Sequence, residues 1–393
     1  LPIRRAEGLA AALLEVAGER QAKVAAYLYN SPEYVEVVYA AAKASMVPVN
    51  TNYRYLDDEL VYLWDNADAV AVVFHGCFAE TVERVRARVG RVRLWVWVDD
   101  GSGACPSWAV PYEQLAAAPP AGGLRPPWGR SAEDCFFIYT GGTTGMPKGV
   151  MWHQDDLYRL LSPGVVDDPD AADLAAVRRR LRTTPGQRGL PACPLMHGTG
   201  FLTALSVLMT GGCIVSLTGR RLDVAELLDT VAAERVHRLT IVGDAFARPM
   251  VEALDAHPGR WDLSPLRVIV SSGAMWSEQV KQALSRHVPD TLLVDMLCAS
   301  EAVGVGQSVS SGRRSSSTAS FKLGARTRVF TEDGVAVEPG SGEIGLLAVG
   351  GPIPVGYYKD PDRTARTFRT SAGARWSVPG DWARVEADGS VTL

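Results

Sequence analysis

One short stretch of the chain combines the residue types that bind phosphate. The segment FIYTGGTTGMPKGVMW, residues 137–152, holds glycines, threonines and Lys148 behind an apolar lead-in. Glycines let a backbone approach a ligand closely, and bare N–H groups and hydroxyls donate hydrogen bonds to phosphate oxygens. The segment therefore predicts a phosphate-binding loop. It does not follow the P-loop pattern G-x-x-x-x-G-K-[ST], because Pro147 precedes Lys148 and Gly149 follows it.

The same stretch resembles the phosphate-loop motif of the adenylate-forming superfamily, which includes acyl-CoA synthetases, luciferases and the adenylation domains of peptide synthetases. The motif Y-T-[SG]-G-T-T-G-x-P-K-G matches Tyr139 through Gly149, with Gly141 where the family usually has serine. The resemblance implies a loop that wraps the β- and γ-phosphates of ATP. Its ATP-binding residues would be Thr140, Gly141, Gly142, Thr143, Thr144, Gly145 and Lys148.

Other motifs of the family follow in the expected order along almost the whole chain. PLMHGTG resembles the motif whose histidine, here His197, lies beside the acyl carboxylate. A core histidine that caps a helix is the plainer interpretation. SSGAMW resembles the strand end whose Ser272, Gly273 and Ala274 line the adenine. A simple strand-to-helix turn would have much the same sequence, so position along the chain carries this assignment.

The stretch DMLCASEAVG occupies the place of the family's Y-G-x-[ST]-E motif. The resemblance puts Ser300 on the hydroxyl that meets the α-phosphate and Glu301 on the carboxylate that holds Mg²⁺. By itself, a glutamate after a serine is ordinary at the solvated start of a helix. Leu297 and Cys298 replace the usual aromatic-glycine pair, so adenine stacking is expected to be weaker or to be provided differently.

Two more motifs lie toward the C-terminal end. GYYKDPDRTARTF fits the family spacing G-Y-x-x-x-x-x-x-T-x-x-x-F, with Gly356, Tyr357, Thr364 and Phe368 at the matched positions. PGDWARVEADGSVTL places Asp381 on the aspartate that accepts hydrogen bonds from both ribose hydroxyls. That role suits a carboxylate, which can accept two hydrogen bonds at once.

The resemblance implies a two-step ligase reaction that uses ATP, Mg²⁺ and coenzyme A. A carboxylate attacks the α-phosphorus of ATP and expels pyrophosphate, and the thiol of coenzyme A then attacks the acyl-adenylate and releases AMP. Catalysis of nucleotidyl transfer is mostly positioning and charge neutralisation. On the resemblance, the catalytic residues would be Lys148, Glu301 and His197, with the metal on Glu301.

The acid is expected to be hydrophobic. Peptide-synthetase adenylation domains usually hold an aspartate soon after the histidine motif, and MHGTGFLTALSVL has no acidic residue, so an amino acid is disfavoured. The acyl pocket would include His197, Gly198, Phe201, Asp244 and Phe246. It would take a medium- to long-chain acid or a ring-bearing acid such as a sterol side chain. A helix cap is the simpler interpretation of Asp244.

Other functions stay open. The departures at Gly141, Leu297 and Cys298 favour a non-catalytic scaffold that binds a nucleotide or an adenylate. An enzyme that forms the adenylate without the CoA step is a further alternative. A loop that binds some other phosphate would require several motifs to coincide by accident.

Strands and helices alternate in the regions that must position these motifs. Between Ala22 and Val98, the apolar runs KVAAYLYN, MVPVN, AVAVVF and LWVWV predict strands, separated by the helical patterns PEYVEVVYAAAKAS, LDDELVYLWDNA and CFAETVERVRARV. Asn30 or Ser31 is expected to cap the first helix. A second set of strands, LPACPL, CIVSL, RLTIVG and LRVIVSSG, comes with the helices DVAELLDTVAAERV and SEQVKQALSRHV.

These patterns predict an α/β fold. Two packed α/β subdomains with mainly parallel sheets would cover residues 1–320, and a small β-barrel-like subdomain of short strands and glycine turns would cover 321–393. This arrangement corresponds to the large N-terminal domain of an adenylate-forming enzyme. In that superfamily a small C-terminal domain follows, and it is expected after residue 393.

The composition excludes several classes of partner. The 393 residues carry a formal net charge of −4 and a pI near 5.9, so we expect no general attraction to nucleic acid or to an anionic membrane. Six cysteines lie far apart without a C-x-x-C pair, which argues against a zinc site or disulfide scaffold and for a cytoplasmic location. We expect no transmembrane segment. Small-molecule substrates are the expected partners, and a homodimer stays an open alternative to a monomer.

Overall fold

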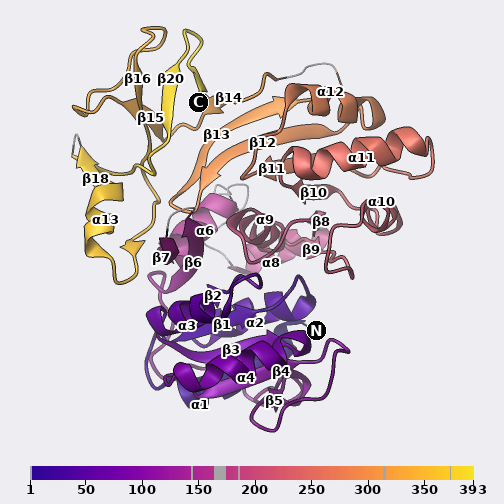
Figure 1. The fold of residues 1–393 in the computed structure, drawn as a ribbon, viewed down its shortest axis with the longest axis vertical. Coiled ribbons are helices and arrows are strands. Elements are labelled where there is room, and N and C mark those ends of the chain that lie inside the picture. The colour runs from indigo at the N-terminus through magenta and orange to yellow at the C-terminus, as the bar shows by residue number, and fades with distance from the viewer. Residues whose placement is uncertain (1, 143–144, 163–173, 185, 313–315, 372) are drawn as a thin grey trace. The chain divides into compact units, whose positions relative to one another are not determined.

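The structure is a computed structural model that describes residues 2–142, 145–162, 174–184, 186–312, 316–371 and 373–393 (Figure 1). Contacts between Cα atoms divide the chain into two compact units. Unit 1 comprises Leu1–Asp155 and Val355–Pro361, and unit 2 comprises Asp156–Pro354 and Asp362–Leu393. Each unit is described separately below.

Unit 1 is built on one sheet of eight strands within the described residues, in the order β17-β7-β6-β2-β1-β3-β4-β5. Strands β1 to β6 pair in parallel where they are neighbours, and β6, β7 and β17 pair antiparallel. The sheet strands are β1 (Lys23–Tyr27), β2 (Val47–Asn50), β3 (Ala69–His75), β4 (Leu94–Val98), β5 (Val110–Pro111), β6 (Cys135–Gly142), β7 (Gly145–His153) and β17 (Gly356–Tyr357).

The helices of unit 1 follow the sequence pattern closely. Ser31 is the N-cap of α2 and accepts a hydrogen bond from the backbone N–H of Tyr34, and Pro32 opens the helix, where a missing N–H is harmless. The pattern CFAETVERVRARV forms a short α-helix, α4, with a 3₁₀ turn at each end rather than one continuous helix. The helical elements are α1 (Pro2–Ala17), α2 (Pro32–Lys43), α3 (Asp57–Asn66), η1 (Gly76–Phe78), α4 (Ala79–Val85), η2 (Arg86–Arg88) and α5 (Tyr112–Ala116).

Unit 2 is built on a second sheet, of thirteen strands within the described residues. Neighbours among β8 to β12 pair in parallel, and from β12 onward the pairing is antiparallel. The strands are β8 (Arg188–Pro191), β9 (Cys213–Ile214), β10 (Arg238–Ile241), β11 (Val268–Ser272), β12 (Leu292–Ala299), β13 (Ala302–Ser310), β14 (Ser320–Leu323), β15 (Thr327–Phe330), β16 (Ile344–Val349), β18 (Phe368–Ser371), β19 (Ala374–Ser377), β20 (Trp382–Val385) and β21 (Ser390–Thr392).

Helices accompany the parallel part of this sheet, and α11 and α12 lie side by side beyond β11 and β12 in Figure 1. The helices are α6 (Gln154–Leu161, which begins at the unit boundary), α8 (Leu174–Thr183), α9 (Gly198–Met209), α10 (Val224–Ala233), α11 (Asp244–Ala256), α12 (Glu278–His287) and α13 (Pro361–Thr367). The apolar faces of α10, α11 and α12 bury a core with β10 and β11 that includes Leu228, Met250, Ile269 and the fully buried Trp276.

The fold confirms an α/β chain with two sheet-based halves. The predicted strand CIVSL forms β9, which is only two residues long and follows α9. The boundary expected at residue 320 falls at the first residue of β14, which is hydrogen-bonded to β13 in a continuous sheet. The strands after it are short and antiparallel, as the glycine-punctuated sequence predicts.

Candidate functional site

The predicted phosphate loop is the end of a β-hairpin in unit 1. Strands β6 and β7 pair Tyr139 with Gly149 and Thr140 with Lys148, and an irregularity follows Thr140. Gly141 and Gly145 are exposed there, and Lys148 is half-buried. Thr143 and Thr144, which the resemblance assigns to ATP, lie outside the described residues. Glycine N–H groups and a lysine at one hairpin end form a suitable surface for an anion.

The base of this hairpin is fixed by Tyr139. The Asn50 side chain accepts a hydrogen bond from the Tyr139 N–H (2.7 Å) and donates one to the Tyr139 carbonyl (2.8 Å). The Tyr139 hydroxyl donates to Asn66 (2.7 Å). A Cβ added to Gly149 would lie 2.7 Å from the Tyr139 ring, so the motif needs glycine at this position. The motif residues therefore hold one another in place.

A second motif pairs with the same hairpin. Gly356 and Tyr357 in β17 pair with Met151 and Val150 of β7. The ammonium of Lys148 lies 5.8 Å from the centre of the Tyr357 ring, within the range of a cation–π contact. Two segments that are distant in sequence, and that the resemblance links to nucleotide binding, are thus neighbours in unit 1.

In unit 2, Ser300 and Glu301 form the tight connection between β12 and β13. Ala299 pairs with Ala302 across this turn, and the register shifts between Leu297 and Ala299. The turn replaces the helix start that was the plainer interpretation of this serine and glutamate. The Ser377 hydroxyl donates to the Glu301 carbonyl (2.6 Å), which ties the turn to β19. A short turn between paired strands fixes the backbone at both residues.

The carboxylate of Asp381 lies close enough to Glu301 to feel its charge. Partial burial, and then repulsion from Glu301, raise the pKa of Asp381 above its ordinary value. The Asp381 carbonyl accepts a hydrogen bond from Leu347 of β16 (2.9 Å), which fixes the backbone beside it. Two neighbouring carboxylates that repel each other are stabilised by a cation or by hydroxyl donors. A cation at Glu301 and ribose hydroxyls at Asp381 are the roles that the resemblance implies for these two carboxylates.

The end of β11 carries Ser272 and is followed by Gly273, two of the residues that the resemblance assigns to the adenine. Ser272 is buried, and Gly273 has φ of +89°, a conformation that favours glycine. The Thr199 hydroxyl of α9 donates to the Ser272 carbonyl over 3.4 Å. The Ser272 hydroxyl and the backbone N–H groups of Gly304 and Val305 donate toward the sulfur of Cys298. Burial outweighs these bonds and raises the pKa of the Cys298 thiol, so it stays protonated at neutral pH.

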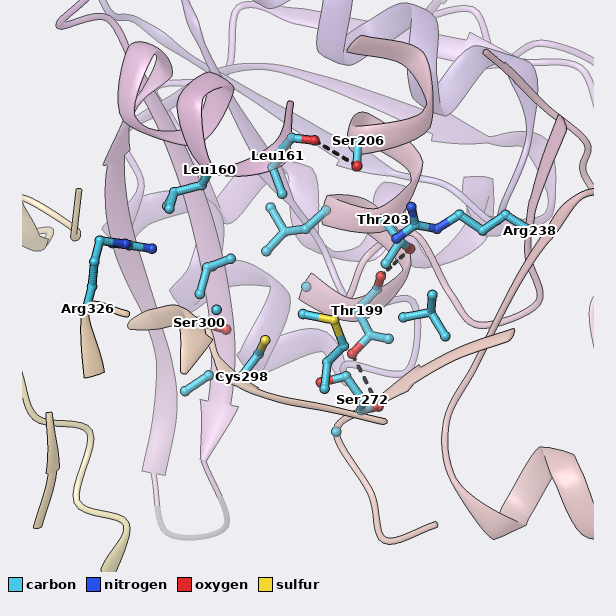
Figure 2. A pocket seen from close by; sticks show the side chains of 18 residues that line it. Leu160, Leu161, Thr199, Thr203, Ser206, Arg238, Ser272, Cys298, Ser300 and Arg326 are labelled. Carbon is cyan, nitrogen blue, oxygen red and sulfur yellow. Dashed lines mark hydrogen bonds between the residues drawn. The ribbon is translucent and has the colours of Figure 1, made fainter. Parts of the chain in front are cut away.

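A cavity of about 510 Å³ opens between these elements of unit 2 (Figure 2). It falls in the size range of small-molecule sites. One part of its lining belongs to the nucleotide motifs or lies next to them: Ser272, Gly273, Cys298, Ala299, Ser300, Thr199 and Gly198. A second part is mainly apolar: Leu160, Leu161, Leu202, Val270, Met296, Val303 and Gly304. The remaining residues are polar or charged: Thr203, Ser206, Arg238 and Arg326. The cavity can therefore hold an apolar molecule beside Ser300.

Of the five residues expected in the acyl pocket, Gly198 lines this cavity. His197, Phe201, Asp244 and Phe246 are among the described residues but do not line it. His197 is exposed at the N-cap position of α9, where its side chain makes no capping hydrogen bond, so the core-histidine interpretation does not describe it. Gly198 is close to Ser300, since a Cβ added to it would lie 3.8 Å from the Ser300 hydroxyl.

Asp244 and Phe246 take part in helix packing. Gly243, not Asp244, is the N-cap of α11. The Asp244 carboxylate accepts hydrogen bonds from the N–H (2.9 Å) and hydroxyl (2.7 Å) of Ser277, the residue that caps α12. Phe246 packs against the core of unit 2. Asp244 thus joins the starts of two helices.

The sequence interpretation did not find Arg238, Thr203, Ser206 or Arg326, which line the cavity. One signal was present, because Arg238 begins the buried strand RLTIVG and a charge there has no obvious structural use. Thr203 and Ser206 looked like ordinary members of an apolar helix.

Within the described part of the chain, no group of three or more His, Cys, Asp and Glu side chains could hold a metal ion. None of the helices in the described residues has the length and apolar character needed to cross a membrane.

Comparison with known proteins identifies relatives along the whole chain. The family model of the AMP-binding enzymes matches residues 4–358. A 3-oxocholest-4-en-26-oate–CoA ligase of Rhodococcus rhodochrous is 35% identical over 402 residues, which covers 99% of this chain and 71% of the relative. A medium/long-chain-fatty-acid–CoA/3-oxocholest-4-en-26-oate–CoA ligase of Mycobacterium tuberculosis is 36% identical over 401 residues, with the same coverage.

Solved structures share the fold at lower identity. An anthranilate CoA ligase in complex with anthranoyl-AMP superposes with a TM-score of 0.82 at 17% identity, over 100% of this chain and 71% of that one. The N-terminal domain of FACL13 from Mycobacterium tuberculosis superposes with a TM-score of 0.79 at 21% identity, over 99% of this chain and 90% of that one. The large N-terminal domain expected from the sequence is therefore the fold observed.

Proposed function

Because the chain belongs to the AMP-binding enzyme family, we propose that it is an acyl-CoA ligase for a hydrophobic carboxylic acid. The relatives named above are CoA ligases for fatty acids and for a steroid acid. The observation that carries the proposal is the cavity of unit 2, where apolar side chains share one space with Ser272, Gly273 and Ser300. An acid in this cavity would lie next to the residues assigned to the adenylate.

The first step would join the acid to AMP. A carboxylate oxygen of the acid forms a bond to the α-phosphorus of ATP as the bond to the β-phosphate bridging oxygen breaks and pyrophosphate leaves. We assign the Ser300 hydroxyl to the α-phosphate, and Lys148 with Thr140 and the hairpin glycines to the pyrophosphate. These groups are donors fixed in advance, and such donors stabilise charge that develops in a transition state.

Two carboxylates complete the assignment. Asp381 would accept the ribose hydroxyls, and Glu301 would contribute to a magnesium site, where the bound ion would neutralise phosphate charge. Burial, and then repulsion from Glu301, raise the pKa of Asp381, and the repulsion is relieved when a cation or two hydroxyl donors are present. His197 is assigned to the acid's carboxylate, since its exposed ring is one residue from Gly198 at the cavity wall.

The second step would transfer the acyl group to coenzyme A. The thiolate of coenzyme A forms a bond to the acyl carbon, the acyl–phosphate bond breaks, and AMP leaves. Cys298 is not a candidate acyl carrier in this scheme, because its buried thiol has a raised pKa. An enzyme that stops at the acyl-adenylate would share every residue assigned here, and only the CoA-dependent product distinguishes it.

Two further expectations belong to the same proposal. A cytosolic location is supported by six cysteines that are free within the described structure. A homodimer stays a prediction, which sedimentation at several protein concentrations would test.

Acid-dependent exchange of labelled pyrophosphate into ATP tests the first step in the full-length protein. Lys148→Ala should slow the exchange by about a hundredfold, as expected for loss of one fixed donor. Lys322→Ala is the matched control, because Lys322 is an exposed lysine on β14. Equal exchange rates in the two variants would remove Lys148 from the mechanism.

A further inference from the structure

Arg238 places a positive charge inside the cavity of unit 2. It is the first residue of β10, where its backbone pairs with Gly189 of β8 and Val268 of β11. Its side chain lines the cavity together with Thr203 and Ser206 of α9. Figure 2 shows the guanidinium reaching toward Thr203 from the side of the cavity opposite Arg326.

The guanidinium has no partner within the described residues. Its Nε atom is fully buried and makes no hydrogen bond there. Burial alone lowers the pKa of Arg238, and no carboxylate opposes that effect. Arg238 as a whole is half-buried, and its buried Nε–H is a donor left without an acceptor. A buried donor without a hydrogen bond is unfavourable, so such groups normally have a partner or bind a ligand.

Two other cations of unit 2 show the usual arrangement. Arg326 also lines the cavity, and it donates hydrogen bonds to the carbonyls of Gly350 (2.8 Å) and Pro352 (3.3 Å). Lys281 is fully buried, but Ser316 accepts a hydrogen bond from it (3.2 Å) and Asp295 lies 3.9 Å away. Arg238 differs from both because its donors point into the space that a ligand would fill.

The hydroxyl groups beside Arg238 already donate their hydrogen bonds to backbone carbonyls. The Thr203 hydroxyl donates to the carbonyl of Thr199 (2.6 Å), and the Ser206 hydroxyl donates to the carbonyl of Leu161 (2.8 Å). Neither is a counter-charge. The donors available in this part of the cavity therefore belong to the guanidinium, which needs an oxygen acceptor.

Strand pairing sets Arg238 apart from the end of the cavity assigned to the adenylate. Arg238 pairs with Val268, and Ser272 lies four residues further along the same strand. At about 3.3 Å per residue, the two positions are about 13 Å apart along the sheet. Ser300 and Arg238 accordingly lie on different sides of the cavity in Figure 2.

We propose that Arg238 binds an oxygen atom at the far end of the acid, remote from the carboxylate that reacts. The substrate class is then a hydrophobic acid with a distal oxo group or a second carboxylate, not a plain hydrocarbon chain. A guanidinium suits both acceptors, because its planar set of N–H groups can donate two parallel hydrogen bonds. A plain chain would bury Arg238 without a partner. This inference rests on the proposed function, since it identifies the acid of the same ligase site.

The test compares acids of matched length. Calorimetry on the 393-residue chain would measure binding of ATP, of dodecanoic acid, of its derivative with an oxo group on the penultimate carbon, and of dodecanedioic acid. A steroid acid with and without a ring ketone would form a second pair. We expect an oxygenated acid to bind at least about tenfold more tightly than its plain counterpart, as for one hydrogen bond to a charged group.

Substitutions of Arg238 make the test specific. Arg238→Met should bring the affinity ratio close to one, and Arg238→Lys should restore part of it. Arg267→Met is the matched control, because Arg267 precedes Val268 at the same end of the sheet but is exposed. Thermal unfolding of ligand-free Arg238→Met should occur at the same or a higher temperature, since the variant loses a half-buried charge whose Nε–H has no acceptor.

Each outcome bears on one statement. A preference for the diacid or for the oxo acids supports the inference and identifies which acceptor is used. Equal binding of plain and oxygenated acids, or a ratio unchanged in Arg238→Met, overturns it and leaves the proposed ligase intact. Binding of ATP with no binding of any acid overturns the proposed function itself, and the inference with it.

Discussion

The buried pair of Lys281 and Asp295 gives a prediction whose size follows from the structure. Asp295 lies on β12, the strand that ends at Ser300, and its side chain is buried. Burial raises its pKa from 3.8 to about 6, although the nearby ammonium of Lys281 lowers it. Ionising Asp295 therefore costs the folded state about 3 kcal/mol, at about 1.4 kcal/mol per pH unit.

The sign of the effect follows from the raised pKa. The contribution of Asp295 to stability is fully present below its ordinary pKa of 3.8 and is lost as the pH rises through about 6. In Lys281→Met, burial and the charge of Asp244 act without opposition, so the pKa of Asp295 rises further. The deficit of the variant relative to wild type should then grow by about 1.4 kcal/mol per pH unit above pH 6.

Urea unfolding monitored by the fluorescence of the ten tryptophans, which include the fully buried Trp276 of unit 2, would measure this deficit. Expected values are about 1.4 kcal/mol at pH 7 and about 3 kcal/mol at pH 8, by the same linkage. At pH 5 the variant should equal or exceed wild type, because wild type then buries the Lys281 ammonium beside a neutral Asp295. Lys322→Met, an exposed control, should stay within about 0.5 kcal/mol throughout. A deficit that is the same at pH 5 and pH 8 would show that Lys281 acts by packing and would refute the electrostatic reasoning.

Two further predictions concern the assigned nucleotide residues. Gly149→Ala should destabilise unit 1 by about 1–3 kcal/mol, because its Cβ would lie 2.7 Å from the Tyr139 ring. Gly145→Ala is the control, because a Cβ there meets nothing within 4 Å. Equal melting temperatures for the two variants would disprove the close contact. ATP affinity should fall as the pH drops through the raised pKa of Asp381, because a protonated carboxyl accepts fewer hydrogen bonds. Glu301→Gln should move this loss of affinity to lower pH, and it should also increase the magnesium requirement. Calorimetric titration with ATP across pH and magnesium concentration would check both effects, and an unchanged pH profile in Glu301→Gln would contradict the coupling.

The sequence predicted the regular parts of the fold because local patterns determine them. Buried runs such as KVAAY and LWVWV became parallel strands, and the Ser31–Pro32 pair started a helix at the expected place. Elements whose ends depend on distant packing were less predictable. The segment CIVSL pairs over two residues only, and CFAETVERVRARV is broken by 3₁₀ turns.

The site divides in the same way. Motif order along the chain led to Ser300, Glu301 and Asp381, and the structure brings Glu301 and Asp381 within electrostatic range although 80 residues separate them in sequence. The cavity was harder to predict, because its lining comes from strands and helices that touch only after folding. Asp244 and Phe246 belong to a segment that was expected to border the pocket, but they contact α12 and the core. Arg238 lines the cavity, although it lies on a strand that was predicted from its apolar residues.

The most direct test of the proposed ligase is the product itself. The full-length protein would be incubated with ATP, magnesium, coenzyme A and a mixture of fatty and steroid acids, and the products would be identified by mass spectrometry. We predict an acyl-CoA thioester whose formation requires ATP and coenzyme A and is accompanied by AMP. Bound ATP with neither an acyl-adenylate nor an acyl-CoA would contradict the account and identify a nucleotide-binding scaffold, and an acyl-adenylate that coenzyme A never consumes would contradict the second step.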